Sequence, residues 1–265
     1  MAGMRVTIIA GWISLFWIIS GMAEDVGVLP KLILDSHDPY ALTVLKDGKS
    51  YRLSVPQDFA HELEDIYDSV ALKDLTGDGM DEVIFHLEGG GVNACSRVLS
   101  YSNDDHSLKE LLFKGGSLCN FKLKDGHVIS FYRDRGAWSE DVYSFKSGKA
   151  NILISDRCIG CGQVQREQYL SNGSMVRSLV TDDPDVNKRV PLLAYVVALK
   201  ARIFSAPDSR QMTNKYLISG DEVELLDFHD TQGEDWIEFR FHGATTTEGW
   251  MRCGDIGGCF KPRPG

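Results

Sequence analysis

The chain has 265 residues, of which 43% are hydrophobic and 10% aromatic, and it carries 28 Lys and Arg against 38 Asp and Glu. This composition fits a globular chain long enough for two domains, and it excludes an intrinsically disordered protein. The net charge of −10 argues against nucleic acid and anionic membrane surfaces as partners.

The first 23 residues predict a secretory signal peptide. Arg5 provides a positive start, residues 6–19 are almost wholly apolar, and Gly21-Met22-Ala23 places small residues at the expected cleavage site. A retained membrane anchor is the alternative, because the apolar run is near the lower length limit for a span. The acidic pair Glu24-Asp25 directly after the site favours cleavage. We therefore expect a periplasmic protein with no membrane contact after the signal is removed.

Short strands separated by turn dipeptides predict an all-β fold from residue 31 onward. Asp47-Gly48, Asp125-Gly126 and Asn172-Gly173 each lie between two β-type runs, which is the pattern of an antiparallel hairpin. One helix is expected within residues 56–67, where apolar residues recur at helical spacing. The polar stretch 181–188 contains a proline and predicts a linker, so we place the domain boundary at residues 181–194.

Together, the predicted cleavage site and this linker divide the chain into four parts. We expect a signal peptide at residues 1–23, an antiparallel β domain at 24–180, the linker at 181–194 and a small barrel at 195–265.

The stretch from residue 74 to residue 82 has the spacing of a calcium-binding loop. Asp74, Thr76 and Asp78 occupy loop positions one, three and five, followed by the Met80 carbonyl and the Glu82 carboxylate. The run of apolar residues after Glu82 predicts a buried strand, so the loop is not an EF-hand. Thr76 replaces the usual Asp or Asn, which predicts a modest affinity for calcium. A metal-free turn rich in Asx residues is the alternative.

A glycine-rich segment at residues 88–94 follows the next strand. It lacks the lysine and the helix of a phosphate-binding loop, so we interpret it as a recognition loop near the metal.

Six cysteines lie after the signal peptide, and an even number in an exported chain predicts disulfides. Six cysteines allow fifteen pairings. The order of the strands favours Cys95–Cys119, Cys158–Cys161 and Cys253–Cys259, because each pair lies in one strand-and-turn unit. A redox motif or half of a zinc site at Cys158 and Cys161 is the alternative.

Residues 69–180 resemble a family of small periplasmic proteins that protect bacteria from secreted peptidoglycan hydrolases. Three segments carry the resemblance: the calcium-type loop at 74–85, the strand–turn–strand at 127–145, and residues 156–161 with 166–169. The resemblance implies a propeller-like array of antiparallel sheets, one calcium ion, and a loop that plugs the cleft of a glycan hydrolase.

The turn of the second segment supplies candidate partner-binding residues. Tyr132, Arg133, Arg135 and Trp138 can offer hydrogen-bond donors and an aromatic ring to a cleft that contains catalytic carboxylates. The alternative is that the two arginines pair with surface acids of this chain.

Residues 195–265 resemble a bacterial SH3-like barrel, with Trp236, Phe239 and Trp250 as core or groove aromatics. Such barrels often bind cell-wall peptides, so the resemblance implies a recognition module.

Sequence motifs of enzymes are missing from the chain: it has no nucleophile elbow, no Walker loop, and no histidines at metal-ligand spacing. We expect a non-catalytic immunity or inhibitor protein that binds a secreted peptidoglycan hydrolase or another effector. The alternative is a peptidoglycan- or surface-binding module. A hydrolase with two distant carboxylates also stays open, because such a pair leaves no trace in a sequence.

Overall fold

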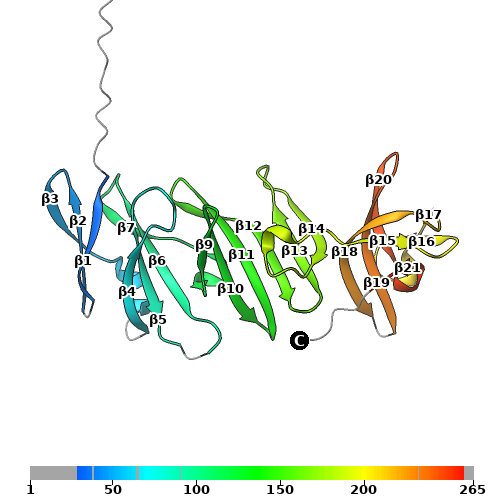
Figure 1. Cartoon of the computed structure of the whole chain (residues 1–265), viewed down its shortest axis with the longest axis horizontal. Helices are drawn as coiled ribbons and strands as arrows, with labels where there is room; N and C mark the ends of the chain where they lie inside the picture. The colour runs from blue at the N-terminus through cyan, green and yellow to red at the C-terminus, as the bar shows by residue number, and fades with distance from the viewer. Residues whose placement is uncertain (1–28, 38, 64–65, 90, 232, 260–265) are drawn as a thin grey trace, which may run out of the picture.

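The computed structural model describes residues 29–259 apart from residues 38, 64–65, 90 and 232, so the predicted signal peptide lies outside the described residues. The predicted all-β class with antiparallel sheets is confirmed. The sheets follow one another along the long axis of the molecule, like consecutive propeller blades set in an open row (Figure 1). In the part of the chain that the structure describes, no helix has the length and hydropathy needed to span a membrane.

The N-terminal half of the row consists of two sheets and one short helix. The first sheet has the order β1-β2-β3, and the second has β4-β5-β6-β7 with β8 added beside β6. The strands are β1 (Lys31–His37), β2 (Tyr40–Lys46), β3 (Lys49–Leu53), β4 (Tyr67–Lys73), β5 (Glu82–Leu87), β6 (Cys95–Ser102), β7 (Ser107–Glu110) and β8 (Leu118–Cys119). The predicted helix is confirmed as α1 (Gln57–Leu63), and a 3-10 turn, η1 (Lys114–Gly116), precedes β8.

The third sheet is a six-stranded meander with the order β14-β13-β12-β11-β10-β9. Its strands are β9 (Lys122–Lys124), β10 (His127–Asp134), β11 (Ala137–Lys146), β12 (Lys149–Ile159), β13 (Gln163–Tyr169) and β14 (Met175–Thr181). All of them pair antiparallel with their neighbours, as the predicted hairpins require.

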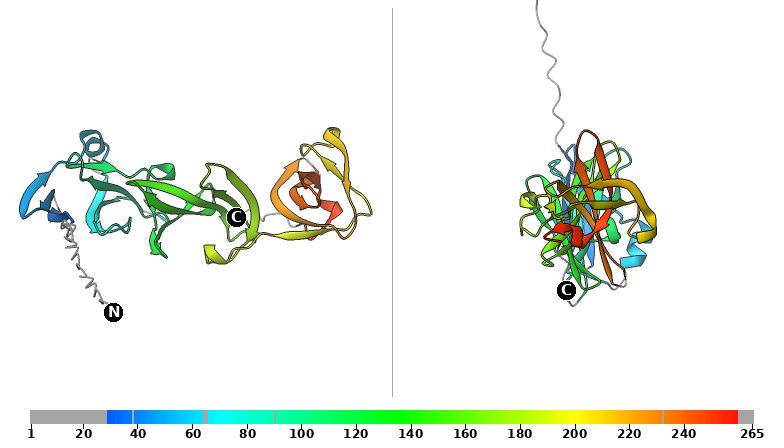
Figure 2. Two further views of the ribbon diagram at one scale, coloured as in Figure 1. Left: turned by 90° about the horizontal axis from the view of Figure 1, so that it is seen from above. Right: turned by 90° about the vertical axis from the view of Figure 1, so that its right-hand side faces the viewer.

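The C-terminal sheet is strongly curled and has the order β17-β16-β20-β19-β18-β15-β21 (Figure 2). Its elements are β15 (Leu193–Val196), β16 (Ala201–Phe204), η3 (Ser209–Gln211), β17 (Met212–Leu217), β18 (Glu222–Thr231), β19 (Glu234–His242), β20 (Thr246–Arg252), η4 (Cys253–Asp255) and β21 (Ile256–Gly257). Trp236 is 0% exposed and packs edge-on against Phe204, so this aromatic residue is buried and is not part of an open groove.

Apolar layers fill the spaces between consecutive sheets. Phe85 and Phe59 belong to a layer shared by the first sheet, α1 and the second sheet. Phe113 and Val128 belong to a layer between the second and third sheets. Leu179 of β14 is a member of the core of the curled sheet. Each sheet is therefore stabilised by burial against its neighbours in the row.

The segment between β14 and β15, where the sequence predicts a linker, packs against the third sheet. Its 3-10 turn η2 (Val186–Lys188) buries Val186 beside Ile129 and Val142. Arg189 is 4% exposed and ion-pairs with Asp156 at 2.6 Å and with Glu140 at 2.9 Å. This buried ion cluster fixes the segment on the sheet, because a buried charge is tolerated only when it is paired.

Candidate functional site

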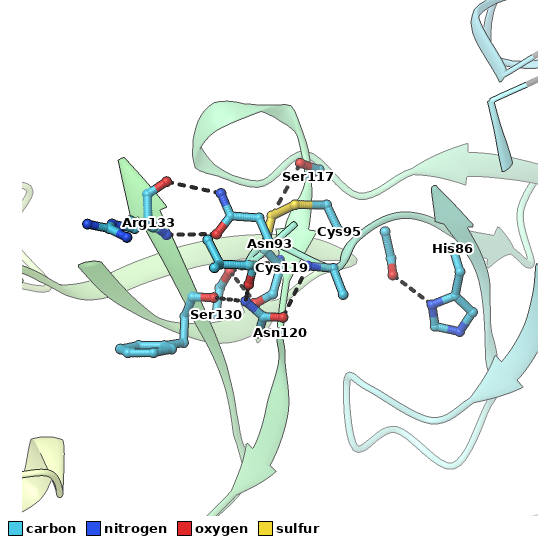
Figure 3. The surroundings of a disulfide bond; sticks show 12 residues. His86, Asn93, Cys95, Ser117, Cys119, Asn120, Ser130 and Arg133 are labelled. Carbon is cyan, nitrogen blue, oxygen red and sulfur yellow. Dashed lines mark hydrogen bonds between the residues drawn. A yellow bond between two sulfur atoms is a disulfide. The ribbon is translucent and has the colours of Figure 1, made fainter. Parts of the chain in front are cut away.

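The three predicted disulfides are confirmed as Cys95–Cys119, Cys158–Cys161 and Cys253–Cys259. The first joins the start of β6 to β8, at the place where the second sheet meets the third (Figure 3). It lies directly after the glycine-rich segment 88–94, so it also fixes the end of that loop.

Two asparagines attach the glycine-rich segment to β10. The Asn93 side chain donates to the Arg133 carbonyl at 3.0 Å and accepts from the Arg133 amide at 2.8 Å (Figure 3). The Asn120 side chain donates to the carbonyls of Val92 and Phe131, both at 2.9 Å. The loop therefore supports the β10–β11 hairpin. It lies at the far end of β5 from the calcium-type loop, so its expected place near the metal is wrong: a six-residue strand, roughly 20 Å long, separates the two.

The tip of the β10–β11 hairpin is a two-residue turn at Arg135 and Gly136. Both residues have positive φ, 49° and 89°, which is the conformation that matches the twist of the flanking strands. Gly136 adopts this conformation without steric cost, whereas Arg135 occupies it as a non-glycine residue. The turn leaves the Arg135 side chain exposed at the end of the hairpin.

The four candidate partner-binding residues do not share one surface. Trp138 stacks on Phe131 with ring centroids 4.5 Å apart and planes at 4°. Tyr132 follows Phe131 and therefore points to the opposite face of β10. Its hydroxyl donates to Asp141 at 2.8 Å. Arg133 and Arg135 are exposed near the tip.

A groove of about 340 Å³ lies beside the hairpin, where residues 114–119 face β10, β11 and β12. Tyr132 and Arg133 are in its lining, whereas Arg135 and Trp138 are not. The full lining is Lys114, Gly115, Ser117, Cys119, Tyr132, Arg133, Asp134, Ser139 and Arg157. Three of these side chains are cationic and one is acidic.

A buried carboxylate lies behind the groove. Asp141 is 0% exposed and accepts hydrogen bonds from Tyr132 at 2.8 Å and from Tyr143 at 3.4 Å, while Lys114 Nζ lies 3.8 Å from its Oδ1. Burial, and after it the negative charge of Asp141, raises the pKa of both tyrosines above the ordinary value of 10. The tyrosines therefore act as hydrogen-bond donors at neutral pH.

Unpaired arginines gather around the hairpin. Of the arginines within residues 29–259, five make no ion pair, and three of these are on β10 to β12 or in the turn between β10 and β11: the five are Arg52, Arg133, Arg135, Arg157 and Arg202. The expected alternative, in which Arg133 and Arg135 pair with surface acids of this chain, is therefore wrong. In a chain of net charge −10 such a cluster marks a surface suited to an acidic partner.

The calcium-type loop is closed by its own hydrogen bonds. Asp74 accepts from the amides of Gly77 and Gly79, at 2.7 and 3.1 Å, and Asp78 accepts from the Met80 amide at 2.8 Å. The Glu82 carboxylate, on a residue 2% exposed, accepts from the amides of Leu75 and Thr76 and from the Thr76 hydroxyl.

The donor chemistry of this loop suits a hard cation, although the carboxylates are not gathered around one point. Burial raises the pKa of Glu82 to about 7; the hydrogen bond from Leu75 opposes the rise, and the nearby charges of Asp78 and Asp74 add to it. A cation would compensate these three carboxylates. Among the described residues, however, no three His, Cys, Asp or Glu side chains converge as they would around a metal.

Sequence reasoning missed Lys114, Ser139, Arg157, Asn93 and Asn120 as site residues. Arg157 and Ser139 lie inside segments that carry the family resemblance. Their expected position on adjacent strands is the one sequence feature that could have marked them as site residues. The other three come from loops of the second sheet, and no local pattern singles them out.

Comparison with protein-family models finds no match, and comparison with curated proteins finds none either. A search of solved structures finds "Structure of a Xanthomonas Type IV Secretion System related protein", with 16% sequence identity and a TM-score of 0.33, over 61% of this chain and 85% of that chain. The functional proposal for this chain therefore rests on its own residues.

Proposed function

We propose that this protein binds and blocks a secreted peptidoglycan-degrading enzyme of the lysozyme type, and that it does so without catalysing a reaction. The observation that carries the proposal is a set of arginines without ion pairs: Arg133 and Arg135 on the β10–β11 hairpin, and Arg157 on the adjacent strand β12. Glycan hydrolases hold paired catalytic carboxylates in a cleft. A cationic hairpin that is fixed at its base can enter such a cleft with little loss of conformational freedom.

The cell compartment is part of this proposal. Three disulfides support an oxidising environment, and the sequence at residues 1–23 predicts export, so we place the mature protein in the periplasm. A periplasmic inhibitor would meet the incoming hydrolase before the enzyme reaches the wall.

We also propose calcium as the cofactor of the loop at residues 74–82. Asp74, Thr76, Asp78, the Met80 carbonyl and Glu82 would hold the ion. Its role would be structural: it would offset the charges of the loop and stiffen the start of β5. The loop is at the opposite end of β5 from the segment that supports the hairpin, so a direct contact between calcium and the partner is not part of the proposal.

Inhibition assays with paired hairpin variants test the proposed function. Oxidised protein comprising residues 24–265 is mixed with a panel of secreted peptidoglycan hydrolases, and both glycan cleavage and complex formation are measured. We expect a one-to-one complex and inhibition. The double variant Arg133→Glu/Arg135→Glu should weaken inhibition by roughly a hundred-fold or more, the equivalent of about 3 kcal/mol, through like-charge contacts.

The matched control is Lys46→Glu/Lys49→Glu. Its turn, Asp47-Gly48, also has positive φ at both residues, as Arg135-Gly136 does, but it lies in the first sheet. The control should inhibit as the wild type does. Equal loss in both double variants, or a panel in which no hydrolase is bound, would contradict the proposal.

A second candidate function is supported by the curled sheet. Leu193, Tyr195 and Val197 alternate along β15 and the residue after it, and each is more than half exposed. Leu193 lines a groove that also includes Phe241 and Glu222. An apolar surface with acidic neighbours suits a cell-wall peptide that carries an amine. Sedimentation with purified peptidoglycan distinguishes the two functions, because only the wall-binding module would sediment with it.

A further inference from the structure

We propose that the groove between residues 114–119 and strands β10 to β12 is a carboxylate-binding pocket that takes an acidic side chain of the bound protein. This inference rests on the proposed function, because it names the chemical group of the partner that the site recognises. Four observations support it: an unpaired hydroxyl in the lining, a free guanidinium beside that hydroxyl, a charge balance that favours one added negative charge over two, and a lining fixed before any ligand enters.

The most buried polar side chain of the lining has no partner. Ser139 is 5% exposed and lines the groove, and within residues 29–259 its hydroxyl makes no hydrogen bond. The Ser139 hydroxyl has no partner within the described residues and faces the groove, so it can donate to a group that enters there. A carboxylate oxygen accepts such a bond.

A free guanidinium lies next to this hydroxyl. Ser139 lies between two cross-strand partners: it pairs with Tyr132 of β10 on one side and with Arg157 of β12 on the other. The three side chains thus form a row across one face of the sheet. In the described part of the chain the Arg157 guanidinium makes neither an ion pair nor a hydrogen bond. Its planar set of donors matches the two oxygens of a carboxylate.

The charge balance of the groove favours a singly charged ligand over a doubly charged one. Lys114 and Arg157 contribute two positive charges on the face of Ser139, while Asp134 in the lining and the buried Asp141 behind it contribute two negative charges. A carboxylate adds one negative charge to this balanced groove, whereas a doubly charged phosphate would add two.

Lys114 retains a donor for the ligand. Its Nζ donates to the Ser155 hydroxyl at 2.6 Å and lies 3.8 Å from Asp141. An ammonium group has three donors, so at least one remains for a ligand.

The lining is held in place before any ligand enters. Cys119 is tied to β6 by its disulfide, and its backbone amide donates to the Ser130 hydroxyl at 3.0 Å. The Lys114 amide donates to the Tyr143 hydroxyl at 3.1 Å. A pocket whose sides are already fixed loses little conformational freedom on binding.

Titration with a small carboxylate tests the pocket without any partner protein. Sodium propionate, which carries the same carboxylate group as an Asp or Glu side chain, is added to the ¹⁵N-labelled oxidised protein at constant ionic strength. The arginine Nε–Hε signals and the Ser139 amide are followed by NMR. We expect saturating shifts at Arg157 and Ser139, and weaker binding of inorganic phosphate. Shifts equal to those caused by chloride, or tighter binding of phosphate, would overturn the proposal.

Paired arginine variants locate the binding. Arg157→Gln should weaken propionate binding by about ten-fold or more, because it removes charge-assisted hydrogen bonds. Ser139→Ala should weaken it to a smaller extent. Arg202→Gln is the matched control, since Arg202 is also exposed, unpaired and on a strand, but in the curled sheet. Unchanged binding in Arg157→Gln, or equal losses in Arg157→Gln and Arg202→Gln, would overturn the pocket.

The outcome can be separated from that of the proposed function. If propionate binds as expected and no hydrolase is inhibited, the pocket stands and the inhibitor function fails. If a hydrolase is inhibited equally by the wild type and by Arg157→Gln, the function stands and the carboxylate pocket is overturned.

Discussion

Asn93 and Arg133 exchange two hydrogen bonds through the side chain of one and the backbone of the other. This edge of β10 pairs with β9 only as far as Ile129. Beyond that point, the Asn120 side chain donates to the Phe131 carbonyl, and the Asn93 side chain pairs with both the amide and the carbonyl of Arg133. Two asparagine side chains thus pair with backbone groups of β10 where β9 no longer reaches. They also cover an edge that would otherwise be open to pairing with another chain.

Replacing Asn93 by alanine should loosen the hairpin locally. The Arg133 amide would lose its acceptor, so its hydrogen exchange should become about ten-fold faster, equivalent to about 1.4 kcal/mol, with little change in global stability. Amide exchange followed by NMR measures this. Asn172→Ala is the control, because within the described residues the Asn172 side chain accepts hydrogen bonds only from Ser174 in its own turn. Unchanged exchange at Arg133 in Asn93→Ala would show that the side chain does not support β10.

Breaking the buried ion cluster at Arg189 should cost far more. In Arg189→Met, Asp156 and Glu140 stay buried while one of their partners is lost. Removing one side of such a cluster destabilises a protein by about 3–5 kcal/mol. Urea unfolding of this variant is compared with that of Lys188→Met, in which the adjacent exposed lysine loses the same charge; its effect should stay within about 0.5 kcal/mol. Equal midpoints for the two variants would contradict the role given to the cluster.

The stability of the chelated protein should fall as the pH rises through the range in which Glu82 titrates. The pKa of Glu82 is raised to about 7 from an ordinary value of 4.5. The folded state therefore holds this proton more tightly than the unfolded state, so the contribution is complete below pH 4.5 and is lost as the pH approaches 7. The loss should amount to up to about 3 kcal/mol.

Urea unfolding at several pH values in a chelator measures this loss. Glu82→Gln should remove the Glu82 part of the pH dependence, because the amide does not titrate. An identical pH profile in the wild type and in Glu82→Gln would contradict the prediction.

Calcium should raise the melting temperature of the wild type by about 2–4 °C for each kcal/mol of binding free energy. Asp78→Asn should reduce this rise because it removes one charge from the ligand set. Asp81→Asn is the control, since Asp81 occupies none of the ligand positions. Melting curves in calcium and in a chelator give the comparison. If the wild type melts at the same temperature in both, calcium has no place in the loop.

Local features of this fold could be predicted from the sequence. The turn at Asp47-Gly48 and the bridge between Cys158 and Cys161 each depend on residues a few positions apart, so short patterns determine them. The sequence does not decide whether Trp236 is a core or a groove residue, because its burial depends on how far the sheet curls.

The groove could not be predicted in the same way. Asn93 meets Arg133 across 40 positions of sequence, and Lys114 meets Ser155 across 41. These contacts form only because the second and third sheets pack together over Phe113 and Val128. Strand register then decides that Ser139 and Arg157 share a face. No periodicity in the sequence encodes the meeting of two sheets.

The junction between the third sheet and the curled sheet determines where the molecule can be cut for separate study. The Leu192 amide donates to the Leu179 carbonyl, and the Leu192 carbonyl accepts from the Leu225 amide. Hydrogen bonding thus runs without a break from β14 into β18, and Leu179 fills part of the C-terminal core. A fragment that begins at residue 195 would lose both the bridging residue and a core side chain. An expressible C-terminal fragment must therefore begin before β14.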